Sequence, residues 1–222
     1  MDPEPQGASV AGAPALFPAF LKLAGRKCLV VGAGPIGQSK IEDLLPTGAA
    51  MTVVAPHATE IAQAWARSGR LEWHERRFEA ADLDAMFLVV VATSSPGLNE
   101  SIYQEAQRRG VLCNVVDDPP HCDFYYPAVV RRGALQIAVS TDGKSPALAQ
   151  RLRKKLEAEY DSSYAGWLEE LGTSRQQLFA RAMDPEERRR LLHDLASAAA
   201  YERFARTRAR ASETPLNGEE QP

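Results

Sequence analysis

The chain has 222 residues, of which 45% are hydrophobic and 25% are charged, as in an ordinary soluble globular protein. This length is enough for one large domain or two small ones, and the net charge of −3 gives no reason to expect nucleic acid as a partner. No stretch approaches the roughly 20 apolar residues of a membrane helix, and the Pro-, Gly- and Ala-rich residues 1–15 lack the features of a signal peptide. We therefore expect a cytoplasmic protein with no membrane partner, a disordered arm over residues 1–15 and a disordered tail over residues 212–222.

Strands and helices are predicted to alternate through residues 16–117. Apolar or alternating runs predict strands at residues 28–32, 51–55, 71–78, 87–92 and 111–116. Start and stop signals place helices between them, at residues 35–45, 60–67 and 96–109. Because this alternation is typical of a parallel sheet, the predicted fold class is α/β, with a Rossmann-type doubly wound parallel sheet over residues 16–117.

The pattern changes after residue 117. Residues 124–131 and 134–140 are predicted strands, joined by an Arg-Gly pair at 132–133 as an antiparallel hairpin. From Ser145 onward the chain is predicted to be helical, with Ser145 as N-cap and Pro146 at the first helical position. One face of this helix is apolar, with Leu148, Leu152 and Leu156. A second helix start stands at Asp184, a carboxylate N-cap, and that helix is predicted to run to about Arg210.

The segment GAGPIG, residues 32–37, links the first strand to the first helix. In such a turn Gly32 permits the tight bend, Gly34 lets the backbone approach a pyrophosphate and Gly37 lets helix and strand pack closely. The helix N-terminus would add unpaired N–H groups for the phosphates. The motif therefore favours dinucleotide binding, although a glycine turn that binds no ligand could have the same sequence.

One part of the dinucleotide pattern is absent. The carboxylate that usually binds the adenosine ribose is missing, since residues 51–59 contain neither Asp nor Glu. Ribose hydroxyls would then be met by backbone groups or by His57, which follows Pro56, unless His57 is an ordinary loop residue. No nearby arginine is available in the sequence to accept a 2′-phosphate, which favours NAD over NADP.

The segment CNVVDDPP, residues 113–120, falls at the carboxyl end of a predicted parallel strand, where open α/β sheets bind their ligands. Its adjacent carboxylates, Asp117 and Asp118, either hold charge in a rigid turn at the site or only cap that turn. Thr93, at the end of the preceding strand, opens on the same crevice and could bond cofactor or substrate.

A third polar segment, STDGKSP at residues 140–146, leads into a helix N-terminus with Lys144 beside it, which makes it a second plausible anion site. Any one of the nearby arginines is best read as a solvated surface charge, but together they would suit a substrate with several carboxylates. No metal site is expected, because His121, Cys122 and Asp123 are adjacent and adjacent side chains rarely point at one ion. Cys28 and Cys113 lie in apolar runs and are expected to be buried, reduced thiols.

Taken together, four blocks of the sequence resemble the precorrin-2 dehydrogenase family, whose members also form the front part of sirohaem synthases. The blocks are FPAFLKLAGRKCLVVGAGPIGQSK, VATSSPGLNE, CNVVDDPPHCDFYYPAVV and LQIAVSTDGKSPALAQRLRKKLE, which together span residues 17–160. The NVVDDP and STDGKSP blocks are far more distinctive than the glycine motif. The resemblance implies NAD-dependent oxidation of precorrin-2 to sirohydrochlorin in sirohaem synthesis.

The resemblance also implies an architecture and a set of site residues. A small α+β dimerisation domain would occupy residues 118–160 and a helical C-terminal domain residues 161–211, in a homodimer with its active site between the domains. Asp117 would be the catalytic acid or base, and the family also lacks the ribose carboxylate. The expected cofactor-binding residues are Gly32, Gly34, Pro35, Ile36, Gly37, Pro56, His57 and Thr93. The expected substrate-binding residues are Asn114, Ser140, Thr141, Lys144 and Ser145.

Some features depart from the family or leave alternatives open. Ser94 and Ser95 stand where the family often has aspartates, and Thr141 stands where some members carry a serine that can be phosphorylated. The 222 residues are too few to include the methyltransferase domain of the fused enzymes. One alternative is a bifunctional enzyme that also inserts Fe²⁺ into sirohydrochlorin, and another is a regulatory module that binds NAD without turnover.

Overall fold

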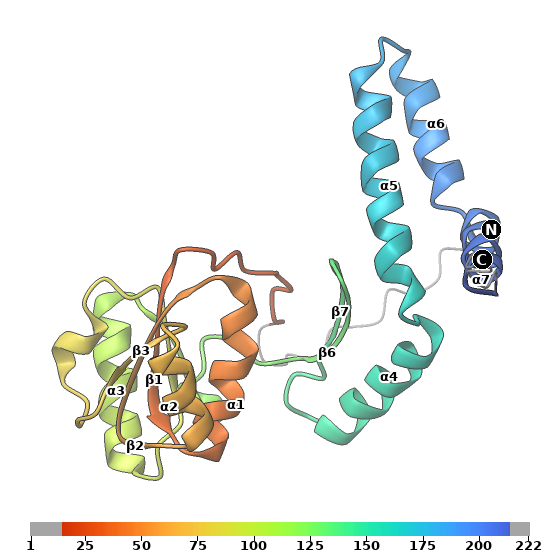
Figure 1. Cartoon of the computed structure of the whole chain (residues 1–222). Coiled ribbons are helices and arrows are strands. Elements are labelled where there is room, and N and C mark those ends of the chain that lie inside the picture. Colours follow the sequence, from red (N-terminus) through yellow and green to blue (C-terminus); the bar gives the residue numbers. More distant parts are fainter. Residues whose placement is uncertain (1–14, 214–222) are drawn as a thin grey trace, which may run out of the picture. The chain divides into compact units, whose positions relative to one another are not determined.

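The computed structural model of the chain describes residues 15–213 (Figure 1). The disordered arm and tail expected from the sequence therefore lie, for residues 1–14 and 214–222, outside the described residues. The chain divides into two compact units, with the boundary between Tyr126 and Pro127.

The first unit is built on a five-stranded parallel sheet, which confirms the predicted Rossmann-type fold. Its strands, in chain order, are β1 (Lys27–Ala33), β2 (Ala50–Ala58), β3 (Glu72–His74), β4 (Leu88–Val91) and β5 (Leu112–Val115). They are arranged side by side in the order β3-β2-β1-β4-β5, and every pairing is parallel. The chain order therefore reverses direction next to β1, between β1 and β4, and this switch point is where such sheets bind ligands.

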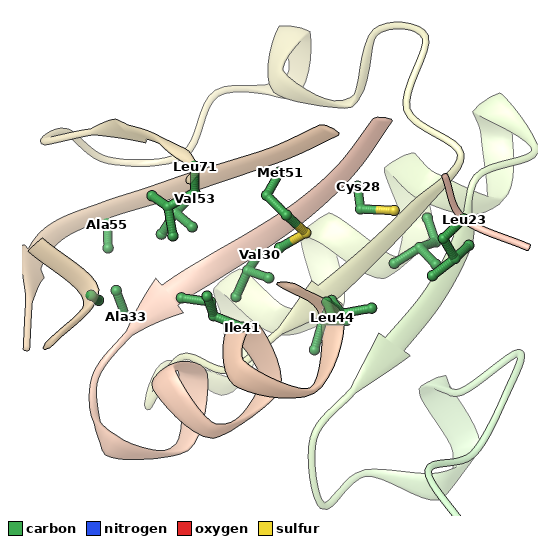
Figure 2. Packing of buried hydrophobic residues seen from close by; sticks show 13 residues of the cluster. Leu23, Cys28, Val30, Ala33, Ile41, Leu44, Met51, Val53, Ala55 and Leu71 are labelled. Atoms are coloured by element: carbon green, nitrogen blue, oxygen red, sulfur yellow. The ribbon is translucent and has the colours of Figure 1, made fainter. Parts of the chain in front are cut away.

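Helices cover both faces of the sheet, and this explains why the central strands β1 and β4 are almost entirely buried and apolar. The helices are α1 (Pro35–Leu44), α2 (Glu60–Arg67) and α3 (Pro96–Arg109). Val30 belongs to one buried cluster, together with Ile41 of α1, as Figure 2 shows. Leu29, the preceding residue of β1, belongs to a second cluster with Ile102 of α3, since successive side chains of a strand point to opposite faces.

Two strands of the first unit differ from the sequence-based expectation by more than one residue at an end. The strand predicted over residues 71–78 is only Glu72–His74, because the chain then leaves the sheet and Arg76 forms an ion pair with Asp82 at 2.5 Å. β2 extends to Ala58, beyond the predicted end, and its pairing with β1 shifts register between Val31 and Ala33.

The segment after β5 folds back onto that strand, and so the first unit extends past residue 117. A 3₁₀ turn at Pro119–His121 reverses the chain, and Cys122 then pairs with Asn114 across a short antiparallel bridge. The Asp123 carboxylate accepts a hydrogen bond from the Cys113 backbone N–H at 2.8 Å. The Asn114 side chain also donates to the Phe124 carbonyl oxygen, so the start of the predicted hairpin strand is bound to β5 instead, and the strand begins at Ala128, four residues later than predicted.

The second unit begins with the predicted antiparallel hairpin, formed by β6 (Ala128–Arg132) and β7 (Leu135–Val139). Arg132 pairs with Leu135, so the connecting turn is Gly133-Ala134 rather than the predicted pair at 132–133. The helix α4 (Pro146–Glu159) packs against the hairpin, and the Arg132 guanidinium donates to the carbonyl oxygens of Glu157 and Tyr160 near its C-terminal end. The predicted N-cap is confirmed, because Ser145 Oγ accepts from the Leu148 N–H at 3.2 Å.

Three further helices complete the second unit: α5 (Ser163–Ala180), α6 (Pro185–Leu195) and α7 (Ala198–Glu213). The N-cap at Asp184 is confirmed, since its Oδ1 accepts from the N–H groups of Glu186 and Glu187. The prediction that this helix continues to Arg210 is wrong. The helix ends at Leu195, and Ser197 starts a new one by accepting a hydrogen bond from the Ala200 N–H. Within the described residues, no helix has the length and apolar character needed to cross a bilayer.

Candidate active site

A cavity of about 920 Å³ lies in the first unit, at the edge of the sheet where the parallel strands end. Its lining comes from the ends of the strands or the segments directly after them, from Arg77 and Phe78 after β3 to Asp117 after β5. This volume is in the range of cofactor-sized sites. The residues expected from the sequence that line it are Gly32, Gly34, Pro35, Ile36, Pro56, His57, Thr93 and Asp117.

The three glycines of the turn have different physical roles. Gly32 has φ +96°, and a Cβ there would lie 2.4 Å from the Ala92 carbonyl oxygen, so the bend requires glycine. A Cβ on Gly37 would lie 2.0 Å from the Gly32 carbonyl oxygen, which makes Gly37 a packing residue rather than part of the cavity lining. A Cβ on Gly34 would meet no atom within 4 Å, because Gly34 faces the open cavity.

The N-terminus of α1 has the donors that a pyrophosphate needs. Its N-cap is Gly34, which provides no side-chain cap, and the first backbone hydrogen bond runs from the Gln38 N–H to the Gly34 carbonyl. The N–H groups of Ile36 and Gly37 are therefore left without a partner among the described residues. Unpaired N–H groups at a helix start, beside a glycine that lets a ligand approach, fit the phosphates of a dinucleotide.

The β2 and β3 side of the cavity is lined by Pro56, His57, Arg77 and Phe78. No arginine stands near the expected ribose position in the sequence, but the structure places Arg77 in the same cavity lining as His57. Arg77 is twenty residues beyond His57, but it follows β3, the strand that pairs with β2. The separation in sequence gave no sign that Arg77 and His57 line one cavity, because this depends on the pairing of β2 with β3.

Asp117 lines the opposite side of the cavity, where β5 ends. It is an exposed residue with a positive φ of 61°, and its carboxylate has no hydrogen-bond partner within residues 15–213. The neighbouring Asp118 instead holds the turn, since its Oδ2 lies 2.7 Å from His121 Nδ1. The sequence left open whether these acids face a site or cap the turn. The structure assigns the structural contact to Asp118 and leaves Asp117 facing the cavity.

His121 anchors this turn to α3. Its Nε2 lies 2.7 Å from Glu100 Oε2, while its Nδ1 contacts Asp118. The hydrogen bond to Asp118, with the nearby charges of Asp118 and Glu100, raises the pKa of His121 above its ordinary value. His121 therefore connects Asp118 of the turn to Glu100 of α3, and both contacts favour its protonated form.

Two other predicted site residues are used mainly for structure. Thr93 lines the cavity, but its Oγ1 donates to Asn99 Oδ1 and accepts from the Ser95 N–H, so it fixes the start of α3. Asn114 is buried and lies outside the cavity lining, and its Nδ2 donates to the Phe124 carbonyl at 2.7 Å. Its amide holds the returning segment against β5, which the polar residue type alone did not reveal.

The predicted anion-binding loop lies in the second unit, directly before α4. Its hydroxyls organise the loop, because Ser140 Oγ accepts from the Asp142 N–H and Thr141 Oγ1 accepts from the Ser145 N–H, each at 3.2 Å. The Lys144 side chain is 83% exposed, and its Nζ lies 3.7 Å from Asp142 Oδ2. The loop is therefore an ordered turn with an accessible cation.

The cysteines and the adjacent metal-ligand types have other partners. Cys122 Sγ donates to the carbonyl oxygens of Val115 and Asp118, whereas Asp123 binds the Cys113 N–H. Within the described residues, no three His, Cys, Asp or Glu side chains are placed to hold a metal ion. Burial raises the pKa of Cys28 to about 11 and that of Cys113 to about 12, so both are neutral thiols, as expected.

Comparisons with known proteins agree with this geometry. Residues 19–128 match the NAD(P)-binding family model, and residues 132–159 match the model described as the central part of a sirohaem biosynthesis protein. The chain is 38% identical over 173 residues to a siroheme synthase of Photorhabdus laumondii, covering 78% of this chain and 37% of that protein. It is 40% identical over 174 residues to siroheme synthase 1 of Serratia proteamaculans, with the same coverage of 78% and 37%. The chain thus spans little more than a third of the length of these relatives.

A solved structure titled SirC, precorrin-2 dehydrogenase, is also similar. It superposes with a TM-score of 0.71 and 29% sequence identity, over 86% of this chain and 98% of that chain. This solved precorrin-2 dehydrogenase, unlike the siroheme synthases, is therefore matched along almost its whole length.

Proposed function

Because the chain belongs to the family of sirohaem biosynthesis proteins, we propose that it catalyses the NAD-dependent oxidation of precorrin-2 to sirohydrochlorin. Support for this assignment comes from the match to NAD(P)-binding and sirohaem segments in one chain and from the likeness to a precorrin-2 dehydrogenase along its length.

The observation that carries the proposal is the layout of the cavity. The glycine turn and the uncapped start of α1 lie at its middle, where β1 ends, and the unpaired Asp117 carboxylate lies where β5 ends. A dinucleotide whose pyrophosphate is bound at α1 would extend along the strand ends in both directions. Its adenosine then falls toward β2 and its nicotinamide toward β4 and β5, next to Asp117.

NAD, when bound, supplies a hydride acceptor. The oxidation removes one hydride and one proton from the macrocycle, and Asp117, the carboxylate of the cavity lining, can take the proton. Its Oδ atoms are suited to this task because no described residue occupies them, while Asp118 and His121 hold the backbone of the turn. Pro35 and Ile36 would line the cofactor site at the pyrophosphate, and Pro56 and His57 would line it at the adenosine ribose.

Ser140, Thr141, Lys144 and Ser145 are proposed to bind carboxylates of the substrate. The exposed Lys144 ammonium and the ordered turn around it supply a cation and backbone donors for such groups. We further propose that the chain acts as a homodimer, because Leu148 and Leu152 on α4 are each 37% exposed and form an apolar strip on the described surface. The neutral buried thiols of Cys28 and Cys113 support a cytoplasmic location.

The direct test is to supply precorrin-2 and NAD to the purified chain and to follow NADH formation and the sirohydrochlorin spectrum together. Both signals should appear with the same stoichiometry. The variant Asp117→Asn should lower kcat about 10²- to 10⁴-fold, the usual contribution of a positioned acid or base. The matched control is Asp84→Asn, which removes an exposed carboxylate that pairs with Arg109 outside the cavity and should retain full activity.

Each part of the proposal has its own contrary result. Full activity in Asp117→Asn would remove the acid/base role from that residue while leaving the reaction assigned. NAD binding without precorrin-2 binding or turnover would instead favour a regulatory module.

A further inference from the structure

At the proposed adenosine end, the lining of the cavity lacks the carboxylate that is usual in a site that binds NAD. In this fold the adenosine ribose lies at the end of β2, where a carboxylate normally accepts hydrogen bonds from its hydroxyl groups. Here β2 ends in Val54, Ala55, Pro56 and His57, all of which line the cavity. Among the residues that line the cavity, Asp117 is the only carboxylate, and it lies three strands away, after β5.

Arg77 takes the place of that carboxylate in the lining. It comes three residues after the end of β3, and β3 pairs with the part of β2 that leads to the ribose position, with Val54 opposite His74. Arg77 is exposed and lines the cavity together with His57. No carboxylate of the described residues forms an ion pair with its guanidinium.

The backbone that carries Arg77 is anchored on both sides. Arg76 donates to both carboxylate oxygens of Asp82, which is 7% exposed, and its Nη1 also donates to the Arg77 carbonyl at 3.0 Å. Phe78 packs against the buried cluster on the α3 face of the sheet. Arg76 therefore stabilises the backbone of this segment, while Arg77 lines the cavity without an ion-pair partner among the described residues.

We propose that Arg77 is a phosphate-binding residue at the adenosine ribose, so that the cavity accepts NADP, with its 2′-phosphate, as well as NAD. An arginine near the end of β2 is the arrangement by which such folds accommodate a 2′-phosphate. The planar guanidinium can donate two hydrogen bonds to one phosphate, and no acid at this end of the cavity would repel it. The adenosine phosphate takes no part in hydride transfer, so the reaction itself is unchanged.

This assignment rests on the proposed function, because it takes the cavity to be the dinucleotide site. The experiment is therefore a binding measurement that needs no tetrapyrrole. NAD⁺ and NADP⁺ are each titrated into the full chain by calorimetry, and 5′-AMP and 2′,5′-ADP are titrated as fragments that isolate the 2′-phosphate. We expect the wild-type Kd for NADP⁺ to be within about 10-fold of that for NAD⁺, since the added phosphate is paired rather than buried alone.

The variant Arg77→Gln should weaken NADP⁺ relative to NAD⁺ by about 10-fold or more, the loss expected for a charged hydrogen-bonded pair. Arg77→Lys keeps the charge but not the planar guanidinium, so its ratio of the NADP⁺ Kd to the NAD⁺ Kd should lie between those of wild type and Arg77→Gln. This second variant also keeps the test valid if Arg77→Gln fails to fold. The control Arg108→Gln removes an exposed arginine at the far end of α3, and it should leave the ratio of the two Kd values unchanged.

The possible failures are distinguishable. If neither dinucleotide binds, the cavity is not a dinucleotide site and the proposed function fails with it. If NAD⁺ binds but NADP⁺ does not, only the role of Arg77 is overturned. The same conclusion follows if Arg77→Gln weakens both dinucleotides equally.

Discussion

The two units of the chain bury their apolar residues in very different ways. In the first unit, strands β1 and β4 are buried along most of their length, and two separate clusters fill the space between the sheet and its helices. In the described part of the second unit, the buried hydrophobic residues are few and scattered: Val130, Ala149, Leu178 and Phe204. The first unit therefore has a buried core of its own, whereas the second holds its helices together mainly through local contacts between neighbouring helices.

Aromatic side chains supply many of those local contacts. Tyr164 of α5 stacks on Tyr201 of α7 with ring centroids 4.3 Å apart, and Trp167 packs against both rings. Such contacts fix how two helices pair, but they leave the outer strip of α4 exposed. The cofactor-sized cavity is therefore lined by the first unit alone, while the second unit has exposed leucines on α4.

The largest effect is expected from a methyl group in the tightest contact of the first unit. Gly37→Ala places a Cβ 2.0 Å from a backbone oxygen, so α1 or the turn must move. We expect the free energy of unfolding of the first unit to fall by about 3 kcal/mol and NAD binding to be lost. Chemical denaturation and calorimetry measure these quantities.

The matched control is Gly34→Ala, which changes a glycine three residues before Gly37 in the same turn. Because its Cβ would meet no atom within 4 Å, the stability should stay within about 0.5 kcal/mol of wild type while NAD binding weakens. Equal stability of the two variants would contradict the packing assigned to Gly37.

The second unit should respond through assembly rather than folding. Leu152→Glu puts a charge into the exposed apolar strip of α4, and in a symmetric dimer each such change counts twice. Burying one leucine contributes about 1.5–3 kcal/mol, so the dimer should dissociate into monomers at micromolar concentration while NAD binding by the first unit is retained. Light scattering after size exclusion measures the change.

Lys154→Glu is the control for this experiment, since it also adds negative charge to α4 but lies on the side of the helix away from Leu152. That variant should remain a dimer. A wild-type chain that is monomeric at all concentrations would overturn the proposed homodimer.

The smallest effect is a dependence of stability on pH. The folded-state pKa of His121 is raised by Asp118 and Glu100, so its contribution is complete below its ordinary pKa of about 6.5 and is lost as the pH rises through the folded value. In thermal melts, the Tm of wild type should therefore exceed that of His121→Asn most at about pH 6, and the difference should narrow as the pH rises through the folded-state pKa. A difference that does not change with pH would show that the protonated ring is not what holds the turn.

Most of the first unit was predictable from the sequence alone. Apolar runs between helices indicated a buried parallel sheet, and the helices at Glu60–Arg67 and Pro96–Arg109 have the predicted bounds. The caps at Ser145 and Asp184 were predictable for the same reason. All of these signals act between residues at most four apart, so the sequence displays them directly. The break between Leu195 and Ala198 was missed because its polar and alanine residues are compatible with a continuous helix.

The strands, the glycine turn and the helix starts could be predicted from the sequence, because each depends on local sterics, periodicity or capping. The surroundings of the cavity depend instead on how distant segments pack. The fold places Arg77 in the same cavity lining as His57, leaves Asp117 without a partner among the described residues while Asp118 holds the turn, and makes Asn114 a buried anchor. These relations depend on which strands become neighbours and on how a returning segment packs, and such contacts join residues that are far apart in the chain.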